Sequence, residues 1–364
     1  MRAVVVRAQD VLVRREVEVA CPPALPAALE RSLLACPDIT AVDRLELTPA
    51  PGARDASAWA ALAEQVAAVT RGADVTHALD LVAGAAALSA RRVTGVPVVV
   101  RAQLCGAGIG PGRRVAVRAA VLRAADAVLV PTEADRDLVR AMGADPQRVR
   151  LCPDAALVAH TECEGRSQRR EGPPEELAGR YVLGMSGVPE QRATQEGLLR
   201  ALLRDTDLHL VLVGSTARRP AADVLRSRAR ALRVDDRVAV RPWHRTADLV
   251  PLVDDASVVV ATRPEPTSAL AALLAMRRAR PVVAVGSAPA AEVVVDGVTG
   301  RLVAPGDVTS LTDALCRTAA DGFRQLAWGQ AGLDRVTARY DATAVLASIT
   351  SAYDRLTARA APAA

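Results

Sequence analysis

The chain has 364 residues, a mass of 38.0 kDa, 51% hydrophobic and 24% charged residues, and a net charge of +5. It is therefore long enough for two domains with apolar cores, and its hydrophobic content excludes wholesale disorder. No apolar run reaches the roughly 18 residues of a membrane-spanning helix, and the N-terminus becomes charged too early for a secretory signal, so we expect a cytoplasmic protein without an integral membrane segment.

Residue types alone disfavour several kinds of chemistry. All 46 basic residues are arginines, which excludes Schiff-base and P-loop lysine chemistry. Aromatic residues make up only 2% and no basic tract is present, so no nucleic-acid partner is expected. The six cysteines form no C-x-x-C pair, and the four histidines show no H-x-H or H-E-x-x-H spacing. We therefore expect reduced thiols and no metal site.

Short β-branched apolar runs alternate along the chain with longer Ala/Leu/Arg-rich stretches of helical character. Strands are predicted at residues 3–6, 96–100, 127–130, 149–151, 181–185, 208–213, 238–240, 258–261, 281–285 and 301–303. Helices are predicted at residues 113–125, 133–142, 195–203, 222–232, 268–278 and 342–358. Strands that are apolar on both faces and alternate with helices indicate parallel sheets covered on both sides. The sequence thus predicts an α/β protein.

The alternation is interrupted at residues 161–180, where large apolar residues are almost absent and Gly, Pro and charged residues gather. We predict an N-terminal domain over 1–165, a linker over 166–180, a second domain over 181–340, and a C-terminal helix and tail over 341–364. Each domain is expected to be a doubly wound Rossmann-like sheet, and the two are expected to face a ligand-binding cleft. The terminal helix either closes the second domain or returns to the first.

The region 261–307 gives the sharpest local signal for a ligand site. A strand ends near Ala261, and a turn of small residues opens a helix for which Thr267 or Ser268 is the predicted N-cap. The free amides of its first turn, at Thr267, Ser268 and Ala269, form an anion site. Ordinary βαβ scaffolding offers the same amides, so both interpretations stay open at this point.

Two runs in this region, A-M-x-x-x-R-P-V-V-A and E-V-V-V-D-G-V-T-G-R-L-V-x-P-G-D, resemble the nucleotide-sugar domain of retaining GT-B glycosyltransferases. The most similar subgroup holds sucrose-phosphate-synthase-like and inositol-phosphate-transferring enzymes. The resemblance continues upstream in L-V-L-V-G at residues 210–214 and, more weakly, in the first domain from Asp74 onward. It implies a GT-B fold, a nucleoside-diphosphate sugar as donor substrate, transfer to an acceptor with retention, and neither a metal nor another cofactor.

Transfer from such a donor requires cations that neutralise the departing diphosphate. In the relatives that the resemblance implies, an Arg and a Lys after the first strand of the second domain supply them. Val188 and Ala193 occupy these two positions here. Arg192 lies beside the Lys position and is expected to bind phosphate, with Gly187 facing the same ligand. A solvated surface arginine is the alternative interpretation.

The same relatives carry two glutamates spaced E-x7-E, the second of which grips the ribose. Glu265 fits the first of them, and the second position falls on Leu273 or Leu274, which cannot accept a hydrogen bond from a hydroxyl. The resemblance therefore implies a reduced donor site. Its expected members are Gly187, Arg192, Glu265, Thr267, Ser268 and Ala269.

The first domain departs from the family pattern in a similar way. Relatives have a Gly-Gly loop after their first strand, whereas the first glycine of this chain is Gly52. A histidine near the sugar in relatives aligns with Gln103, and His77 matches a family histidine whose role is either structural or on the acceptor side. Gly106 opens a Gly-rich loop between a strand and a helix. The expected acceptor-side residues are His77, Gln103 and Gly106.

Two hypotheses from different classes follow. The first is an active glycosyltransferase that contacts its donor in an unorthodox way. The second is a catalytically degenerate GT-B protein that acts as a binding or scaffolding subunit, with a protein partner or a homo-oligomer left open. No catalytic residue is assigned, because the family's positions hold Val188, Ala193, Leu274 and Gln103. An epimerase or a phosphorylase lacks the carboxylates or the cofactor lysine that it needs.

Overall fold

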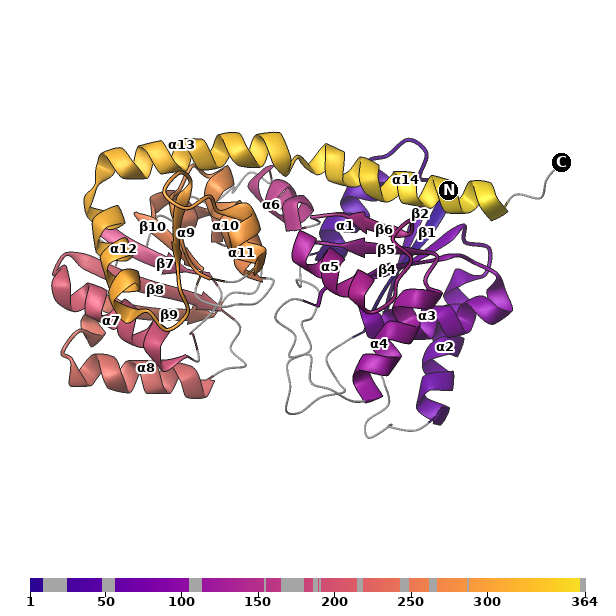
Figure 1. The fold of residues 1–364 in the computed structure, drawn as a ribbon, viewed down its shortest axis with the longest axis horizontal. Helices are drawn as coiled ribbons and strands as arrows, with labels where there is room; N and C mark the ends of the chain where they lie inside the picture. Colours follow the sequence, from indigo (N-terminus) through magenta and orange to yellow (C-terminus); the bar gives the residue numbers. More distant parts are fainter. Residues whose placement is uncertain are drawn as a thin grey trace. The chain divides into compact units, whose positions relative to one another are not determined.

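The structure is a computed structural model that describes residues 1–8, 25–47, 56–104, 113–153, 155–164, 180–185, 189, 191–214, 219–242, 249–261, 267–286 and 288–360. The chain divides into two compact units, Met1–Val158 with Ala342–Ala364, and Ala159–Asp341. Each unit contains a six-stranded sheet in which all paired strands run parallel (Figure 1). We call the sheet of the first unit sheet A and that of the second unit sheet B.

Sheet A has the strand order β2-β1-β3-β4-β5-β6. Its strands are β1 (Arg2–Ala8), β2 (Ala41–Leu47), β3 (Val75–Ala78), β4 (Val98–Arg101), β5 (Ala127–Val130) and β6 (Val149–Leu151). The helices that accompany it are α1 (Leu25–Leu34), α2 (Ala56–Thr70), α3 (Leu81–Thr94), α4 (Arg113–Ala124), α5 (Glu133–Ala141), α6 (Ala155–Glu164) and α14 (Ala342–Ala360). The boundary between the two units falls within α6.

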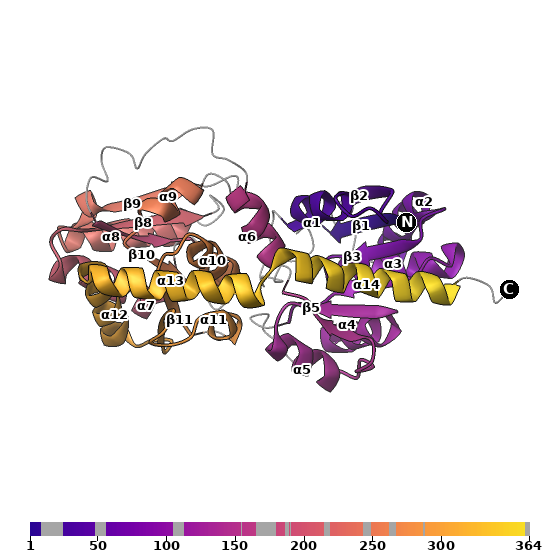
Figure 2. The ribbon, with the colours of Figure 1, turned by 90° about the horizontal axis from the view of Figure 1, so that it is seen from above.

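Side-chain alternation along the strands gives sheet A two different faces. Val4, Ala78 and Val100 point to one face and form an apolar core with residues of α2, α3, α4 and α5. The opposite face is covered in part by α1 and by α14, which contacts β3 and crosses the strands (Figure 2). The C-terminal helix therefore belongs to the first unit, which settles the choice that the sequence left open.

Sheet B has the strand order β12-β11-β10-β7-β8-β9. Its strands are β7 (Arg180–Gly184), β8 (Leu208–Gly214), β9 (Val238–Pro242), β10 (Val258–Ala261), β11 (Val282–Val285) and β12 (Gly300–Val303). Its helices are α7 (Arg192–Arg204), α8 (Arg219–Ala231), α9 (Val250–Asp255), α10 (Thr267–Arg277), α11 (Ala288–Val293), α12 (Val308–Ala320) and α13 (Gly322–Arg339), with a 3-10 turn η3 (Asp235–Arg237).

Helices cover both faces of sheet B. Residues of α7, α8 and α12 form one apolar cluster with the strands, whereas α10 packs on the other side with α9, α11 and α13 (Figure 1). Gly329 lets α13 approach the turn after α10, since a Cβ on Gly329 would collide with the carbonyl oxygen of Ala279. A larger residue there would force the two helices apart.

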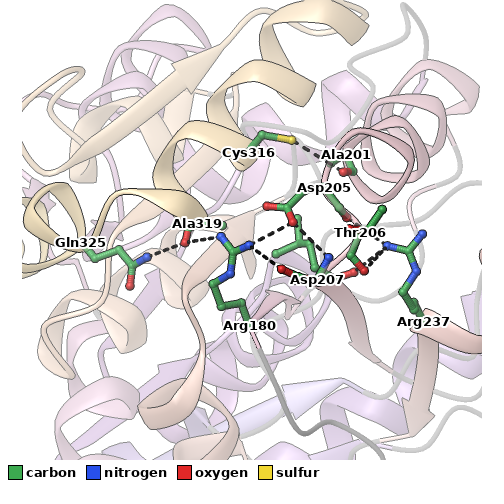
Figure 3. A network of polar contacts seen from close by, with 10 residues as sticks. Arg180, Ala201, Asp205, Thr206, Asp207, Arg237, Cys316, Ala319 and Gln325 are labelled. Carbon is green, nitrogen blue, oxygen red and sulfur yellow. Dashed lines mark hydrogen bonds and ion pairs between the residues drawn. The ribbon is translucent and has the colours of Figure 1, made fainter.

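The amino ends of β7 and β8 are fixed by a network of polar contacts (Figure 3). The Arg180 guanidinium donates to the Asp205 carboxylate at 3.0 Å and to the Ala319 carbonyl at 3.2 Å. Arg237 donates to the carbonyl oxygens of Asp205 and Thr206 at 3.0 and 3.1 Å. These contacts join the α7–β8 turn to the end of α12. The amino edge of sheet B therefore contributes to stability, and ligands of such sheets bind at the opposite, carboxyl edge.

The structure confirms the predicted α/β class. Most predicted strands are found within one or two residues, while β2 and β3 were not among them. Among the helices of the described ranges, none is both long and apolar enough to cross a membrane.

Candidate functional site

The strand order of sheet B reverses between β7 and β10. From β7 the chain proceeds outward to β8 and β9, and it then returns to β10 on the other side of β7 before reaching β11 and β12. Consequently α7, which follows β7, and α10, which follows β10, start at the same edge and pack on opposite faces. Ligands of doubly wound sheets bind in the crevice that such a reversal opens at the carboxyl ends of the strands.

The start of α7 presents an arginine and free amides to this edge. Arg192 is the first helical residue and is exposed, and Ala193 is half-buried. Gln191 precedes the helix without making a side-chain cap hydrogen bond, and no acidic residue lies in the first turn. The positive end of the helix dipole is therefore not neutralised by its own side chains.

A polar clamp holds this helix start in place, and the sequence did not reveal it. Gln195 is 2% exposed; its amide nitrogen donates to the Pro189 carbonyl at 2.8 Å, and its amide oxygen accepts from Arg228 of α8 at 3.2 Å. Arg228 also donates to the Glu196 carboxylate at 2.5 Å and to the Arg192 carbonyl at 3.4 Å. The clamp thus joins α8, the first turn of α7 and Pro189, which lies three residues before the helix.

The start of α10 offers a second set of amides. The helix begins at Thr267, one residue earlier than predicted, and Ala269 is half-buried. No acidic residue lies in its first turn. Leu273 and Leu274, which occupy the predicted ribose position, are 1% and 2% exposed. A helix that is apolar on all sides is buried, and α10 follows that rule.

Several predicted site residues cannot be placed. Gly187, Val188, Glu265 and Gly106 lie outside the described residues, as do the side chains of Thr267 and Ser268. Of the predicted donor set, the structure thus places Arg192 and the backbone of Thr267, Ser268 and Ala269. Across the described ranges, no three His, Cys, Asp or Glu side chains gather in a way that would hold a metal ion.

In the first unit, His77 is buried against the C-terminal helix. Its Nδ1 lies 2.7 Å from the Tyr353 hydroxyl, and the rings meet edge to face. Burial, followed by the positive charge of Arg101, lowers the pKa of His77 to about 3, so the ring is neutral at pH 7. Burial raises the pKa of Tyr353 above its ordinary value, which keeps the phenol protonated.

Gln103 is half-buried at the end of β4, where its amide oxygen accepts from the Arg101 guanidinium at 2.8 Å. The next residue is held by a buried carboxylate, since Asp135 accepts from the Leu104 amide at 2.5 Å and from the Thr132 hydroxyl at 2.6 Å. The structure therefore places His77 on β3 and Gln103 two residues beyond the end of the neighbouring strand β4. Arg101, the last residue of β4 and one residue beyond the predicted strand, donates to Gln103, and its charge acts on His77.

Two doubly wound parallel sheets in one chain, each with a reversal point at its carboxyl edge, are the architecture of a GT-B protein. Comparisons with family models agree. The model of glycosyl transferases group 1 matches residues 185–321, and that of the glycosyl transferase 4-like domain matches residues 2–155.

Individual relatives lead to the same class. D-inositol 3-phosphate glycosyltransferase from Actinosynnema mirum is 30% identical over 287 residues, which cover 71% of this chain and 67% of that protein. Sucrose-phosphate synthase from Thermosynechococcus elongatus matches the fold with a TM-score of 0.75 at 19% identity, over 99% of this chain and 100% of its own. Anabaena HepE, solved in complex with UDP, gives 0.70 at 15% identity, over 98% and 100%. The chain therefore belongs to the GT-B glycosyltransferases.

Proposed function

We propose that this glycosyltransferase transfers a sugar from a nucleoside-diphosphate sugar to an acceptor, with retention at the anomeric carbon and without a metal or other cofactor. The observation that carries the proposal is the pair of helix starts, α7 and α10, at the reversal point of sheet B within the region matched by the group 1 model. HepE, which shares the fold, was solved with UDP bound, in keeping with a nucleotide at such an edge.

We place the donor diphosphate over these helix starts. Each helix N-terminus carries roughly half an elementary positive charge, and free N–H groups there bind phosphate oxygens directly. Arg192 adds a full charge and a planar pair of donors that match a phosphate. On this proposal the amides of Thr267, Ser268 and Ala269 hold one side of the diphosphate, and Gly187 with Arg192 faces the other.

In the proposed reaction the bond between the anomeric carbon and the diphosphate oxygen breaks as the acceptor hydroxyl attacks that carbon from the same face, which gives retention. The hydroxyl proton passes to the departing diphosphate. The protein's part is to position both substrates and to stabilise the charge that builds up on the departing diphosphate. Arg192 and the helix amides are the described groups available for the second task. Leu273 and Leu274 leave the ribose without a carboxylate partner from α10, so we expect the nucleotide to be held mainly through its phosphates.

A thermal-shift panel of UDP, GDP, ADP and TDP with their sugars tests the donor site. A ligand at 100 times its dissociation constant stabilises the folded state by about 2.7 kcal/mol, which raises the Tm of a domain of this size by about 5–10 °C. Arg192→Ala and Ser268→Glu should each reduce that shift, since one removes a cation and the other adds an anion. Arg230→Ala is the matched control, because Arg230 is 71% exposed on α8 with a single long ion pair to Asp235. No shift with any nucleotide, or an equal reduction in Arg230→Ala, would refute the placement.

A further inference from the structure

The first half of α13 presents two large apolar side chains to solvent on one face of the helix. Phe323 is 83% exposed and Leu326 is 76% exposed, and Phe323 is the only phenylalanine of the chain. Single exposed apolar residues are common, but exposed apolar residues that form a contiguous patch indicate an interaction site. Residues three and four apart are neighbours on a helix, so Phe323, Leu326 and the exposed Ala327 form one apolar surface.

The exposed face continues along the helix with polar residues. Gln330 and Asp334 are exposed and follow the apolar surface at helical spacing. We call Phe323, Leu326, Ala327, Gln330 and Asp334 the outer stripe of α13. The opposite side of the helix is buried and packs on α10. In Figure 2, which looks down on α13, no other helix or strand of the second unit is drawn over it.

The outer stripe carries one acidic residue, Asp334, and no basic one, although α13 contains three arginines. Two of these arginines are held against the protein. Arg324 forms an ion pair with Asp321 at 3.4 Å and lies over the Trp328 ring, and Arg335 donates to two carbonyl oxygens at the end of α11 at 2.7 and 2.8 Å. Anionic lipids and nucleic acids bind to basic surfaces, so the stripe fits an apolar protein surface better.

The stripe is complementary to a second copy of itself when the two helices run antiparallel. If they cross between Leu326 and Ala327, these residues of both copies meet at the centre, and Phe323 packs on the aliphatic part of Gln330 from the other copy. At a rise of about 1.5 Å per residue, Asp334 then lies just beyond the amino end of the other helix, which carries a partial positive charge. The two Asp334 carboxylates are about 22 Å apart along the helices, well beyond the screening length of about 8 Å, whereas a parallel pair would bring them together.

We propose that two copies of this chain associate through the outer stripes of α13, as an antiparallel pair with two-fold symmetry and with Phe323 and Leu326 at the core of the contact. A two-fold contact uses the same surface on both copies, and a few large side chains at the core carry most of the binding energy of an interface. One helix pair is smaller than the interfaces of about 1,200–2,000 Å² that hold stable complexes, so we expect a weak dimer with a micromolar Kd. This association does not depend on the proposed donor chemistry.

The test is sedimentation velocity of the full chain at about 1–100 µM, which brackets a micromolar Kd. We expect the sedimentation coefficient of wild type to rise with concentration. Phe323→Gln and Leu326→Gln should each raise the dimer Kd about a hundredfold, because a core residue contributes about tenfold and a two-fold pair loses it twice. Asp334→Arg should also weaken the dimer, since it places a positive charge beside a positive helix end. Val93→Gln is the matched control, because Val93 is an apolar residue on α3 that is 77% exposed.

Self-association that is lost in Phe323→Gln and Leu326→Gln but kept in Val93→Gln supports the proposal. The replaced side chains are exposed, so thermal melts should show an unchanged Tm in all three variants and exclude misfolding as the cause. A monomer at every concentration overturns the proposal, as does a dimer that both stripe variants retain. Flotation of a purely monomeric protein with vesicles of phosphatidylcholine and phosphatidylglycerol would assign the stripe to a membrane instead, and would overturn it too. The nucleotide panel is a separate measurement, so failure of one proposal leaves the other result interpretable.

Discussion

Replacing Gln195 by leucine probes the clamp beneath the proposed donor site. Leucine fills a similar volume but removes both hydrogen bonds of the Gln195 amide, at 2.8 Å to the Pro189 carbonyl and at 3.2 Å from Arg228. Arg228 keeps its contact with Glu196. The Pro189 carbonyl, which lies in a buried residue, loses the hydrogen bond that Gln195 supplies.

The expected loss of stability follows from that unpaired carbonyl. Leaving a buried acceptor without a donor costs about 1–3 kcal/mol, and we take the middle of that range, about 2 kcal/mol, for the Pro189 carbonyl. For a unit of this size, 1 kcal/mol corresponds to a change in Tm of about 2–4 °C. Gln195→Leu should therefore lower the Tm by about 4–8 °C. It should also reduce the nucleotide-induced shift, since the first turn of α7 loses its tether.

Differential scanning calorimetry with and without UDP provides the measurement, and Glu196→Gln is the control. That change weakens two ion pairs whose side chains are 21–55% exposed, and exposed pairs contribute about 1 kcal/mol or less. The reasoning fails if Glu196→Gln is as damaging as Gln195→Leu, or if Gln195→Leu leaves the Tm unchanged.

Three further predictions concern activity, pH and packing. Wild-type donor turnover should be about a thousandfold below that of a relative with both cations, if the loss of the cations raises the activation barrier by about 4 kcal/mol. The double variant Val188→Arg with Ala193→Lys should turn over the donor faster than wild type in a donor-consumption assay. Robust wild-type turnover with no gain in the double variant would contradict this prediction. Because the folded pKa of His77 is about 3 and the unfolded one about 6.5, the unfolded state takes up a proton first as the pH falls, so stability should drop by about 2 kcal/mol between pH 7 and pH 5. Urea titrations of His77→Gln should lack that part of the drop; an unchanged pH dependence would refute the assignment. Gly329→Ala should destabilise by at least about 1–3 kcal/mol, whereas Gly322→Ala, whose Cβ meets nothing within 4 Å, should be neutral in the same thermal melts.

Among the strands that the sequence predicted correctly, the central ones have uniformly apolar runs. β5 and β10 are buried at every residue, and such runs are typical of central parallel strands. β2 was missed because it lies at the edge of sheet A, where Asp43, Arg44 and Glu46 are partly or fully exposed. β3 was missed because it is short and contains Thr76 and His77. His77 is compatible with the core because its Nδ1 is paired with the hydroxyl of Tyr353, which lies 276 residues away along the chain.

The candidate site was predictable only in its outline. A strand followed by small residues and a helix predicted the amides at the start of α10, because that signal is local. The clamp of Gln195 and Arg228 joins two helices, and no local pattern marks a side chain that pairs across 33 residues.

The groups at the carboxyl edge of sheet B, where we place the donor, affect donor binding and catalysis to different extents. Helix amides and Arg192 act on a diphosphate that is already charged in the substrate, so most of their stabilisation is present in the bound donor, and only the part that meets the charge added as the sugar departs favours the transition state. Interactions of that kind lower KM without raising kcat. The positions held by Val188 and Ala193 are those from which, by the family resemblance, cations meet the charge that appears only as the sugar departs. We therefore expect the absence of the two cations to lower kcat, which is the kinetic signature of a lost transition-state contact, and the absence of a ribose carboxylate at Leu273 or Leu274 to weaken donor binding.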